Sequence, residues 1–203
     1  MNTPTYALDR AAYNQGRSAQ FGIGISEDHA QTLVSQGPGA VAVPTPHQYT
    51  IRRLTPTECA RLQGFPDWWA EIPTIEDIDD DTFMFWQNVR QTYADINGKA
   101  YKPATKKQMI KWYNKLHTDS AEYKMWGNGV ALPVVRIPIH GMAQLGARTL
   151  GSLFDGSGGF PLAGLLEGIE TLWASEIEPY PIAVTEWNFK GKAQMLLGGT
   201  THE

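Results

Sequence analysis

The chain has one cysteine, Cys59, among its 203 residues. A single cysteine cannot form a disulfide within the chain, which excludes a small secreted scaffold held together by such bonds. No cationic start followed by an apolar run marks a signal peptide, so we expect a cytoplasmic protein. No uninterrupted apolar stretch approaches the roughly 18 residues of a membrane span, so we expect no membrane partner.

The sequence also has little excess charge of either sign, with 17 Lys and Arg against 21 Asp and Glu. Nucleic-acid binding uses clustered Lys and Arg, which this balance does not favour overall. The charge is uneven along the chain, however. One stretch is acidic (Glu71, Glu76, Asp77, Asp79, Asp80, Asp81) and a later one is basic around Trp112 and Tyr113 (Lys99, Lys102, Lys106, Lys107, Lys111, Lys115). Each stretch fits either a solvated face or a binding surface.

Residues 54–69, "LTPTECARLQGFPDWW", contain the signals of a short helix. Thr55 can cap the amide of Glu58 while Glu58 reaches back to the Thr55 amide, and a proline follows at the first helical position. Gly64 suits the end of the helix. Cys59 falls inside this helix, whereas a nucleophilic thiolate needs an accessible, electropositive setting. We therefore interpret Cys59 as a packing residue and expect no catalytic residue there.

Elsewhere in the first two thirds, the pattern predicts loops followed by helices. Residues 1–48 are rich in Gly and Pro, which predicts short strands and turns such as Gln31 to Ser35. Apolar residues recur at intervals of three and four from Ile75 to Asn97, as in an amphipathic helix. A second helix is expected from about Thr105 to His117.

The rest of the chain changes character. After a glycine turn in "WGNG", the segment Val130 to Val135 is ambiguous, because Pro133 fits an early helical turn better than a strand centre. Beyond it, the order is an apolar strand "RTLGSLF", a glycine loop "DGSGG", a helix "FPLAGLLEGI" and a second strand "TLWASE". This order predicts the opening of a Rossmann-like β-α-β unit.

The glycine loop suits a ligand with a nucleoside and a carboxylate, because a loop that opens a helix presents free backbone amides. Glu176 follows Gly156 by twenty positions, where an acidic side chain can accept hydrogen bonds from ribose hydroxyls. The dinucleotide fingerprint would need a third glycine where the chain has Pro161, which argues against NAD. S-adenosylmethionine fits better. The alternative is that the glycines only make the turn.

At this point the chain resembles the DNA cytosine-5 methyltransferases. "LGSLFDGSGGFPLAGLLEGIETLWASEIEPYPIAVTEWNF" is similar to the first two signature motifs of that family, "RRLTPTECARLQGFPDWW" to the ninth and "YKMWGNGVALPVV" to the tenth. "HAQTLVSQGPGAVAV" resembles the small-domain segment before the ninth motif. The resemblance implies S-adenosylmethionine as cofactor, no metal, and double-stranded DNA as substrate. The cofactor-binding residues that it implies are Phe154, Gly156, Ser157, Gly158, Gly159, Glu176, Ile177, Asn128, Gly129 and Val130.

Two features depart from the family pattern. The motifs stand in the order nine, ten, one, so the chain resembles a circular permutation or the tail of one enzyme joined to the head of another. The Pro-Cys nucleophile loop, the Glu-Asn-Val segment and the Arg-rich strand do not occur. The resemblance therefore implies a fragment or a component of a split or rearranged methyltransferase, of phage or restriction-modification origin, that transfers a methyl group from S-adenosylmethionine to C5 of cytosine in DNA. We expect this chain to be inactive without a complementary chain.

The expected fold is α/β, a partial Rossmann-like S-adenosylmethionine-dependent methyltransferase fold with a loop-rich small-domain segment at the N-terminus. We expect residues 1–69 to be part of the small, target-recognition domain, residues 70–120 to be a helical spacer, and residues 121–203 to bind the cofactor. Two other functions stay open: a non-catalytic DNA-binding or interaction module, and a nucleotide-dependent oxidoreductase.

Overall fold

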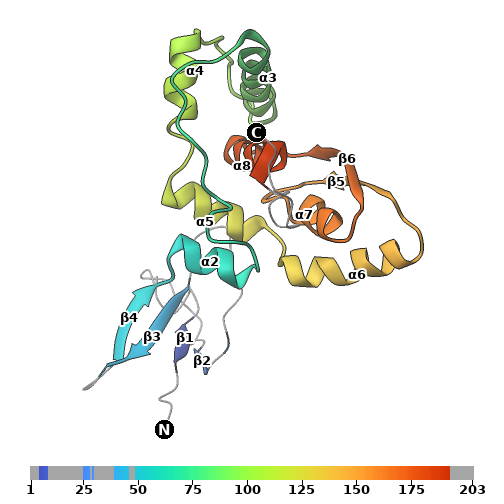
Figure 1. The fold of residues 1–203 in the computed structure, drawn as a ribbon. Helices are drawn as coiled ribbons and strands as arrows, with labels where there is room; N and C mark the ends of the chain where they lie inside the picture. The colour runs from blue at the N-terminus through green and yellow to red at the C-terminus, as the bar shows by residue number, and fades with distance from the viewer. Residues whose placement is uncertain (1–4, 9–24, 28, 30–38, 46–48, 193–203) are drawn as a thin grey trace.

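The computed structural model describes residues 5–8, 25–27, 29, 39–45 and 49–192 (Figure 1). Most of the loop-rich segment expected over residues 1–48, including Gln31 to Ser35, lies outside the described residues. The described part contains an antiparallel sheet with the strand order β2-β1-β3-β4. Its strands are β1 (Tyr6–Leu8), β2 (Ile25–Glu27), β3 (Ala40–Pro44) and β4 (Tyr49–Arg53).

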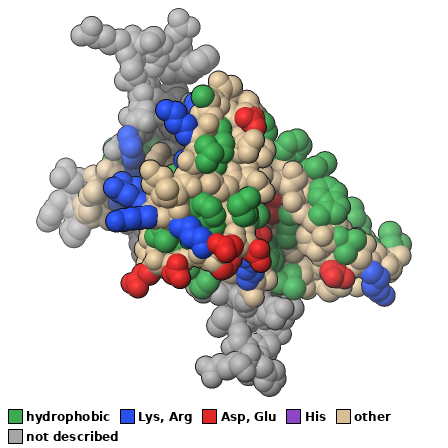
Figure 2. All heavy atoms as spheres, turned by 90° about the horizontal axis from the view of Figure 1, so that it is seen from above, with side chains coloured by type: hydrophobic (Ala, Val, Ile, Leu, Met, Phe, Trp, Pro, Cys, Tyr) green, Lys and Arg blue, Asp and Glu red, His purple; other side chains and the backbone are tan. Residues whose placement is uncertain are grey.

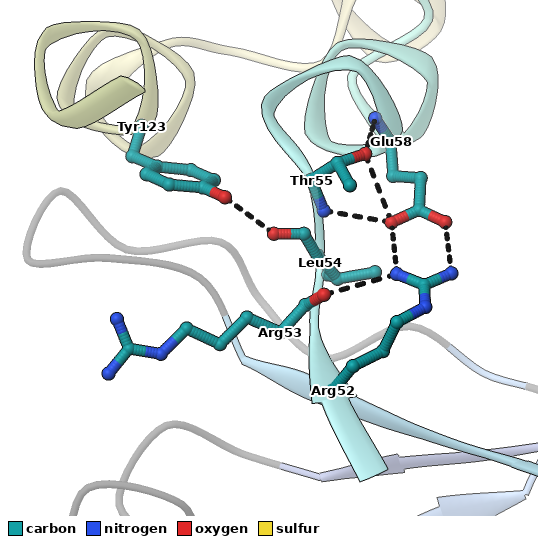
Figure 3. A network of polar contacts seen from close by, with 6 residues as sticks. All are labelled: Arg52, Arg53, Leu54, Thr55, Glu58 and Tyr123. Atoms are coloured by element: carbon teal, nitrogen blue, oxygen red, sulfur yellow. Dashed lines mark hydrogen bonds and ion pairs between the residues drawn. The ribbon is translucent and has the colours of Figure 1, made fainter. Parts of the chain in front are cut away.

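Helix α2 (Pro56–Leu62) follows the sheet and confirms the predicted capping box. Thr55 Oγ1 accepts a hydrogen bond from the Glu58 amide at 3.2 Å, and the Glu58 carboxylate accepts one from the Thr55 amide at 2.8 Å. Arg52, at the end of β4, donates two further hydrogen bonds to that carboxylate, as Figure 3 shows. Gly64 ends the helix as predicted, with a φ of +79° that favours glycine.

Helices α3 (Asp80–Ile96) and α4 (Lys106–Tyr113) are both shorter than the sequence predicts. The expected start of the first helix, at Ile75, is wrong because the Asn114 side chain holds the Ile75 backbone through two hydrogen bonds of 2.9 Å. Asp79 instead caps α3, accepting from the Thr82 amide at 2.7 Å. The expected end of the second helix, at His117, is also wrong, because Asn114 forms its C-cap.

Helices α5 (Asp119–Asn128) and α6 (Leu132–Gln144) include a segment that the sequence left ambiguous. Pro133 lies in the first turn of α6, where its missing amide costs nothing. The glycine turn expected across "WGNG" is confined to Gly129, because the residues before it continue α5. Helix α6 also runs through Pro138, which the sequence analysis did not predict.

The β-α-β unit has the predicted order. Strand β5 (Thr149–Leu153), helix α7 (Gly159–Leu166) and strand β6 (Glu170–Ser175) follow one another, and the two strands pair in parallel. Helix α8 (Pro179–Trp187) and a π-helical turn, η1 (Asn188–Lys192), complete the described chain. In Figure 1, α7 lies beside this two-stranded sheet, and α6 runs below it.

One hydrophobic core joins α2, α5, α6, α7 and α8. Trp69, Trp126 and Leu162 have no exposed surface in it. These three residues come from the stretches that resemble the ninth, tenth and first motifs, so all three stretches pack together. None of the helices within the described ranges is both long and apolar enough to span a membrane.

Candidate cofactor-binding site

The loop between β5 and α7 is tightly bent. Phe154 and Gly156 have φ values of +54° and +55°, and Phe154 is the one non-glycine residue with positive φ in the described chain. The amide of Asp155 donates to the Ser175 carbonyl at 2.9 Å, which ties the ends of the two strands together. The loop therefore starts at the carboxyl edge of the parallel sheet, where α/β folds bind ligands.

The glycines of the loop have different surroundings. A Cβ on Gly158 would lie 2.9 Å from a Thr185 methyl group, so helix α8 requires a glycine there. Gly159 is buried against neighbouring side chains in the same way. At Gly156 the nearest atoms to such a Cβ are at 3.9 Å and at 4.0 Å, the latter being the Cα of Gly129. Of these three glycines, Gly156 alone leaves its backbone open to approach by a ligand.

Glu176 already holds the loop in place. Its carboxylate accepts hydrogen bonds from the amides of Gly156, Ile177 and Glu178 at 2.7, 2.6 and 2.8 Å. A carboxylate has about four acceptor positions, so about one is left for another donor. Binding both hydroxyls of a ribose would require Glu176 to release an amide.

The end of α5 faces this loop. A Cβ on Gly129 would lie 3.1 Å from the Ser157 hydroxyl oxygen, so the two segments are in close contact. Asn128 lines a cavity of about 60 Å³ together with Gly156 and Glu176. The structure thus brings together side chains and backbone from two stretches that the sequence analysis assigned to one site.

Seven of the ten expected site residues do not line this cavity, namely Phe154, Ser157, Gly158, Gly159, Ile177, Gly129 and Val130. Phe154 is 89% exposed, Val130 is 39% exposed, and Ile177 is half-buried beside Glu176. A cavity of about 60 Å³ has room for about two water molecules, at roughly 30 Å³ each. S-adenosylmethionine is much larger, so it would have to lie across the open surface that Phe154 borders.

Asp155 is a buried acidic residue in the loop that the sequence analysis missed. It is 5% exposed and accepts a hydrogen bond from the Ser152 hydroxyl at 2.5 Å. Burial raises the pKa of its carboxyl group to about 6, and the nearby charge of Glu176 adds to the effect. A signal was present, since this acidic residue directly follows the predicted strand "RTLGSLF".

Trp69 lies in the hydrophobic core and forms a hydrogen bond with the glycine loop. Its indole nitrogen donates to the Ser157 carbonyl at 2.7 Å, and its own carbonyl accepts from the Asn188 amide group at 2.6 Å. Trp69 and Ser157 are 88 residues apart, so no local pattern predicts this contact. The end of the ninth-motif stretch therefore helps to fix the conformation of the first-motif loop.

Cys59 is 1% exposed and lies in the hydrophobic core. Burial raises the pKa of its thiol to about 12, with smaller contributions from Glu58 and Glu122. The thiol is therefore protonated near neutral pH, whereas nucleophilic attack needs a thiolate. Within the described ranges there is also no group of three His, Cys, Asp or Glu residues that could hold a metal ion.

Residues 4–85 match the family model of the C-5 cytosine-specific DNA methylases. The match covers less than half of the chain and shows similarity to that family over this segment. The matched segment includes the antiparallel sheet, α2 and the beginning of α3. It ends before α5 and the glycine loop, so the similarity to the methylase family rests on residues outside the candidate cofactor site.

Two relatives have methyltransferase names. The DNA N-6-adenine-methyltransferase of Escherichia phage P1 is 31% identical over 114 residues, which are 55% of this chain and 13% of the relative. The type II methyltransferase M.HgiCI of Herpetosiphon aurantiacus is 61% identical over 36 residues, which are 18% of this chain and 8% of the relative. The chain thus spans only a small part of either relative.

Proposed function

We propose that this chain is a component of a DNA cytosine-5 methyltransferase and that it contributes the part that binds S-adenosylmethionine. The observation that carries the proposal is the convergence of Asn128, Gly156 and Glu176 on one cavity at the carboxyl edge of β5 and β6. The match of residues 4–85 to the family model of the C-5 cytosine-specific DNA methylases supports it.

Each residue at this edge would have a separate role. Glu176 would accept a hydrogen bond from a ribose hydroxyl, and Gly156 would let the ligand approach the backbone closely. Asn128 and Gly129 would lie toward the methionine part, and the exposed ring of Phe154 would cover the adenine. Bound S-adenosylmethionine would supply the methyl group.

The proposal includes a complementary chain and double-stranded DNA. The parallel sheet of the described chain has two strands, and a Rossmann-like methyltransferase fold needs more. The Pro-Cys nucleophile of the resembling family is absent from the sequence. We therefore expect no transfer of tritiated methyl groups to DNA by the purified chain, and transfer by the chain alone would contradict the proposal.

Cofactor binding can be tested by calorimetric titration with S-adenosylhomocysteine and, separately, with NAD. We expect S-adenosylhomocysteine to bind and NAD not to bind. Gly156→Val places a side chain in the open space above the loop. Glu176→Gln removes the negative charge of the carboxylate that would accept a hydrogen bond from a ribose hydroxyl. Each variant should weaken binding by tenfold or more.

A matched control separates loss of the site from strain in the backbone. Gly168 also has positive φ, at +72°, and a Cβ there would meet nothing within 4 Å. Gly168→Val therefore introduces comparable strain in the same β-α-β unit without touching the cavity. Equal affinity in Gly156→Val, Glu176→Gln and the parent chain would refute the proposed site.

The second candidate is a non-catalytic DNA-binding module derived from a methyltransferase, which the missing nucleophile motif favours. This candidate predicts that DNA is retained in a mobility-shift assay while S-adenosylhomocysteine gives no calorimetric signal. The calorimetric titration with S-adenosylhomocysteine therefore distinguishes the two candidates.

A further inference from the structure

A second, larger cavity of about 510 Å³ lies where α3, the connection to α4, α4 itself and the start of α8 meet. Its lining includes four basic side chains, from Arg90, Lys99, Lys102 and Lys115. The lining has one acidic residue, Glu178, which forms an ion pair with Lys124 at 2.7 Å. The cavity therefore carries an excess of positive charge although the whole chain has a net charge of -4.

Arg90 is positioned by aromatic rings rather than by a carboxylate. Its guanidinium carbon lies 5.1 Å from the ring centre of Trp112 and 6.0 Å from that of Tyr101. No ion pair joins Arg90 or the three lysines to an acidic group in the part of the chain that the structure describes. Stacking orients the planar guanidinium but leaves its N–H donors for another partner.

The acidic stretch at the start of α3 lies far from Arg90. Asp81 precedes Arg90 by nine residues, which is about 14 Å along a helix axis, farther than a Debye length at physiological salt. Figure 2, which looks down on the α3–α4 end of the molecule, shows several Lys and Arg side chains on its left side, while acidic side chains along the lower margin lie beside other Lys and Arg side chains.

The cavity combines two chemistries. Cationic groups bind phosphates, and the rings of Tyr93, Tyr101 and Trp112 offer surface on which an aromatic base can stack. A purely apolar ligand would not need four cations, and an inorganic anion would not need three aromatic rings. A base pair inside a duplex hides its faces, so stacking on these rings requires an unpaired base.

We propose that this basic-aromatic pocket binds unpaired nucleotides of a nucleic acid strand, with their phosphates on the basic side chains and their bases against the aromatic rings. The site goes beyond the proposed function, because its basic side chains and the rings of Tyr93, Tyr101 and Trp112 do not line the cofactor cavity, although Ala121, Glu178 and Tyr180 line both. Its lining also lies outside the segment that matches the methylase family. It depends on that function only for the choice of DNA as the probe.

The test uses fluorescence anisotropy with the full chain and a fluorescein-labelled 12-nucleotide strand of thymidylate. Lys102→Gln/Lys115→Gln removes two cations from the pocket, whereas the control Lys107→Gln/Lys111→Gln removes two exposed cations of α4 that do not line it. We expect at least tenfold weaker binding in the first variant and less than threefold in the control. The salt dependence should also fall by about 0.7 per lost phosphate contact in the first variant.

Arg90→Lys keeps the charge but loses the planar stacking group, so we expect threefold to tenfold weaker binding. Equal losses of strand affinity in the two double-lysine variants would overturn the proposed pocket, because they would indicate nonspecific electrostatic attraction. Binding of a 12-base-pair duplex at least as tight as that of the single strand would overturn the assignment to unpaired nucleotides. So would full competition by free thymidine monophosphate at the same nucleotide concentration.

The titration with S-adenosylhomocysteine distinguishes this proposal from the proposed function. The lysine and Arg90 variants should bind S-adenosylhomocysteine as the parent chain does. If the parent chain binds the strand through the pocket but does not bind S-adenosylhomocysteine, the cofactor proposal fails and the pocket stands. If the parent chain binds S-adenosylhomocysteine but does not bind the strand through the pocket, the pocket is refuted and the cofactor proposal is unaffected.

Discussion

Asp155 is the residue whose burial has the clearest consequence for stability. Its pKa is raised to about 6 from an ordinary value of 3.8, so the folded chain binds the proton more tightly than the unfolded chain does. The stability from this proton is fully present below pH 3.8 and is lost as the pH rises through about 6. We expect the melting temperature of the parent chain to fall between pH 5 and pH 7.5.

Asp155→Asn removes this pH dependence, because the amide is neutral and still accepts from Ser152. At pH 7.5 the unfolding free energy of Asp155→Asn should exceed that of the parent chain by up to about 3 kcal/mol, from roughly 1.4 kcal/mol per pKa unit. This gap in stability should be smaller at pH 5. Differential scanning fluorimetry across this range measures the gap. Asp95→Asn, an exposed change on α3, is the control. A gap that is constant with pH would contradict the role of Asp155.

At the scale of elements, the start of α2 depends on Glu58, which closes the capping box and binds Arg52. The hydrogen bonds from Arg52 lower the pKa of Glu58 to about 2. A lowered pKa contributes stability that is present above the ordinary value of 4.5 and lost as the pH falls through about 2. We expect Glu58→Gln to destabilise the chain by about 1–2 kcal/mol at pH 6, a figure reduced for partial exposure of the pair.

Urea denaturation of Glu58→Gln and the parent chain at pH 6 and at the lowest pH where both fold would measure this effect. The difference in unfolding free energy should shrink as the pH falls. Glu71→Gln, an exposed change in the loop after Trp69, should show no such trend. If the Glu58→Gln deficit were the same at both pH values, the ion pair would not be its cause.

The same elements show what local sequence can predict. Thr55 caps its helix as the pattern indicates, because both bonds of a capping box lie within four residues. Thr105 and Gln108 form a second capping box, at the start of α4, that the sequence analysis did not single out. The start predicted for α3 failed because the side chain of Asn114, 39 residues away, forms two hydrogen bonds with the Ile75 backbone, which lies outside any helix. Helix α6 continues through Pro138 although a proline there offers no amide to the carbonyl of Val134, a residue that is 66% exposed.

At the scale of the whole molecule, the sequence predicts the parts of the candidate site but not their assembly. The strand, glycine loop and helix around Gly156 follow from local patterns. The contact of Trp69 with Ser157 and the approach of Gly129 to the loop depend on how the core packs over long separations. Without the resemblance, nothing in the spacing would have linked Asn128 to Glu176.

The small parallel sheet also predicts how the isolated chain behaves. Strands β5 and β6 form a two-stranded sheet within the described residues, with Leu153, Leu172 and Trp173 all more than half exposed. Parallel strands are normally covered on both faces, and open apolar edges pair with other chains.

We expect the isolated chain to self-associate at micromolar concentration. Leu172→Lys should reduce this association, because a charge opposes strand pairing. Leu145→Lys, at a 91% exposed position between α6 and β5, is the control and should associate like the parent. Sedimentation velocity over a hundredfold range of concentration measures both, and a parent chain that stays monomeric throughout would contradict an open sheet edge.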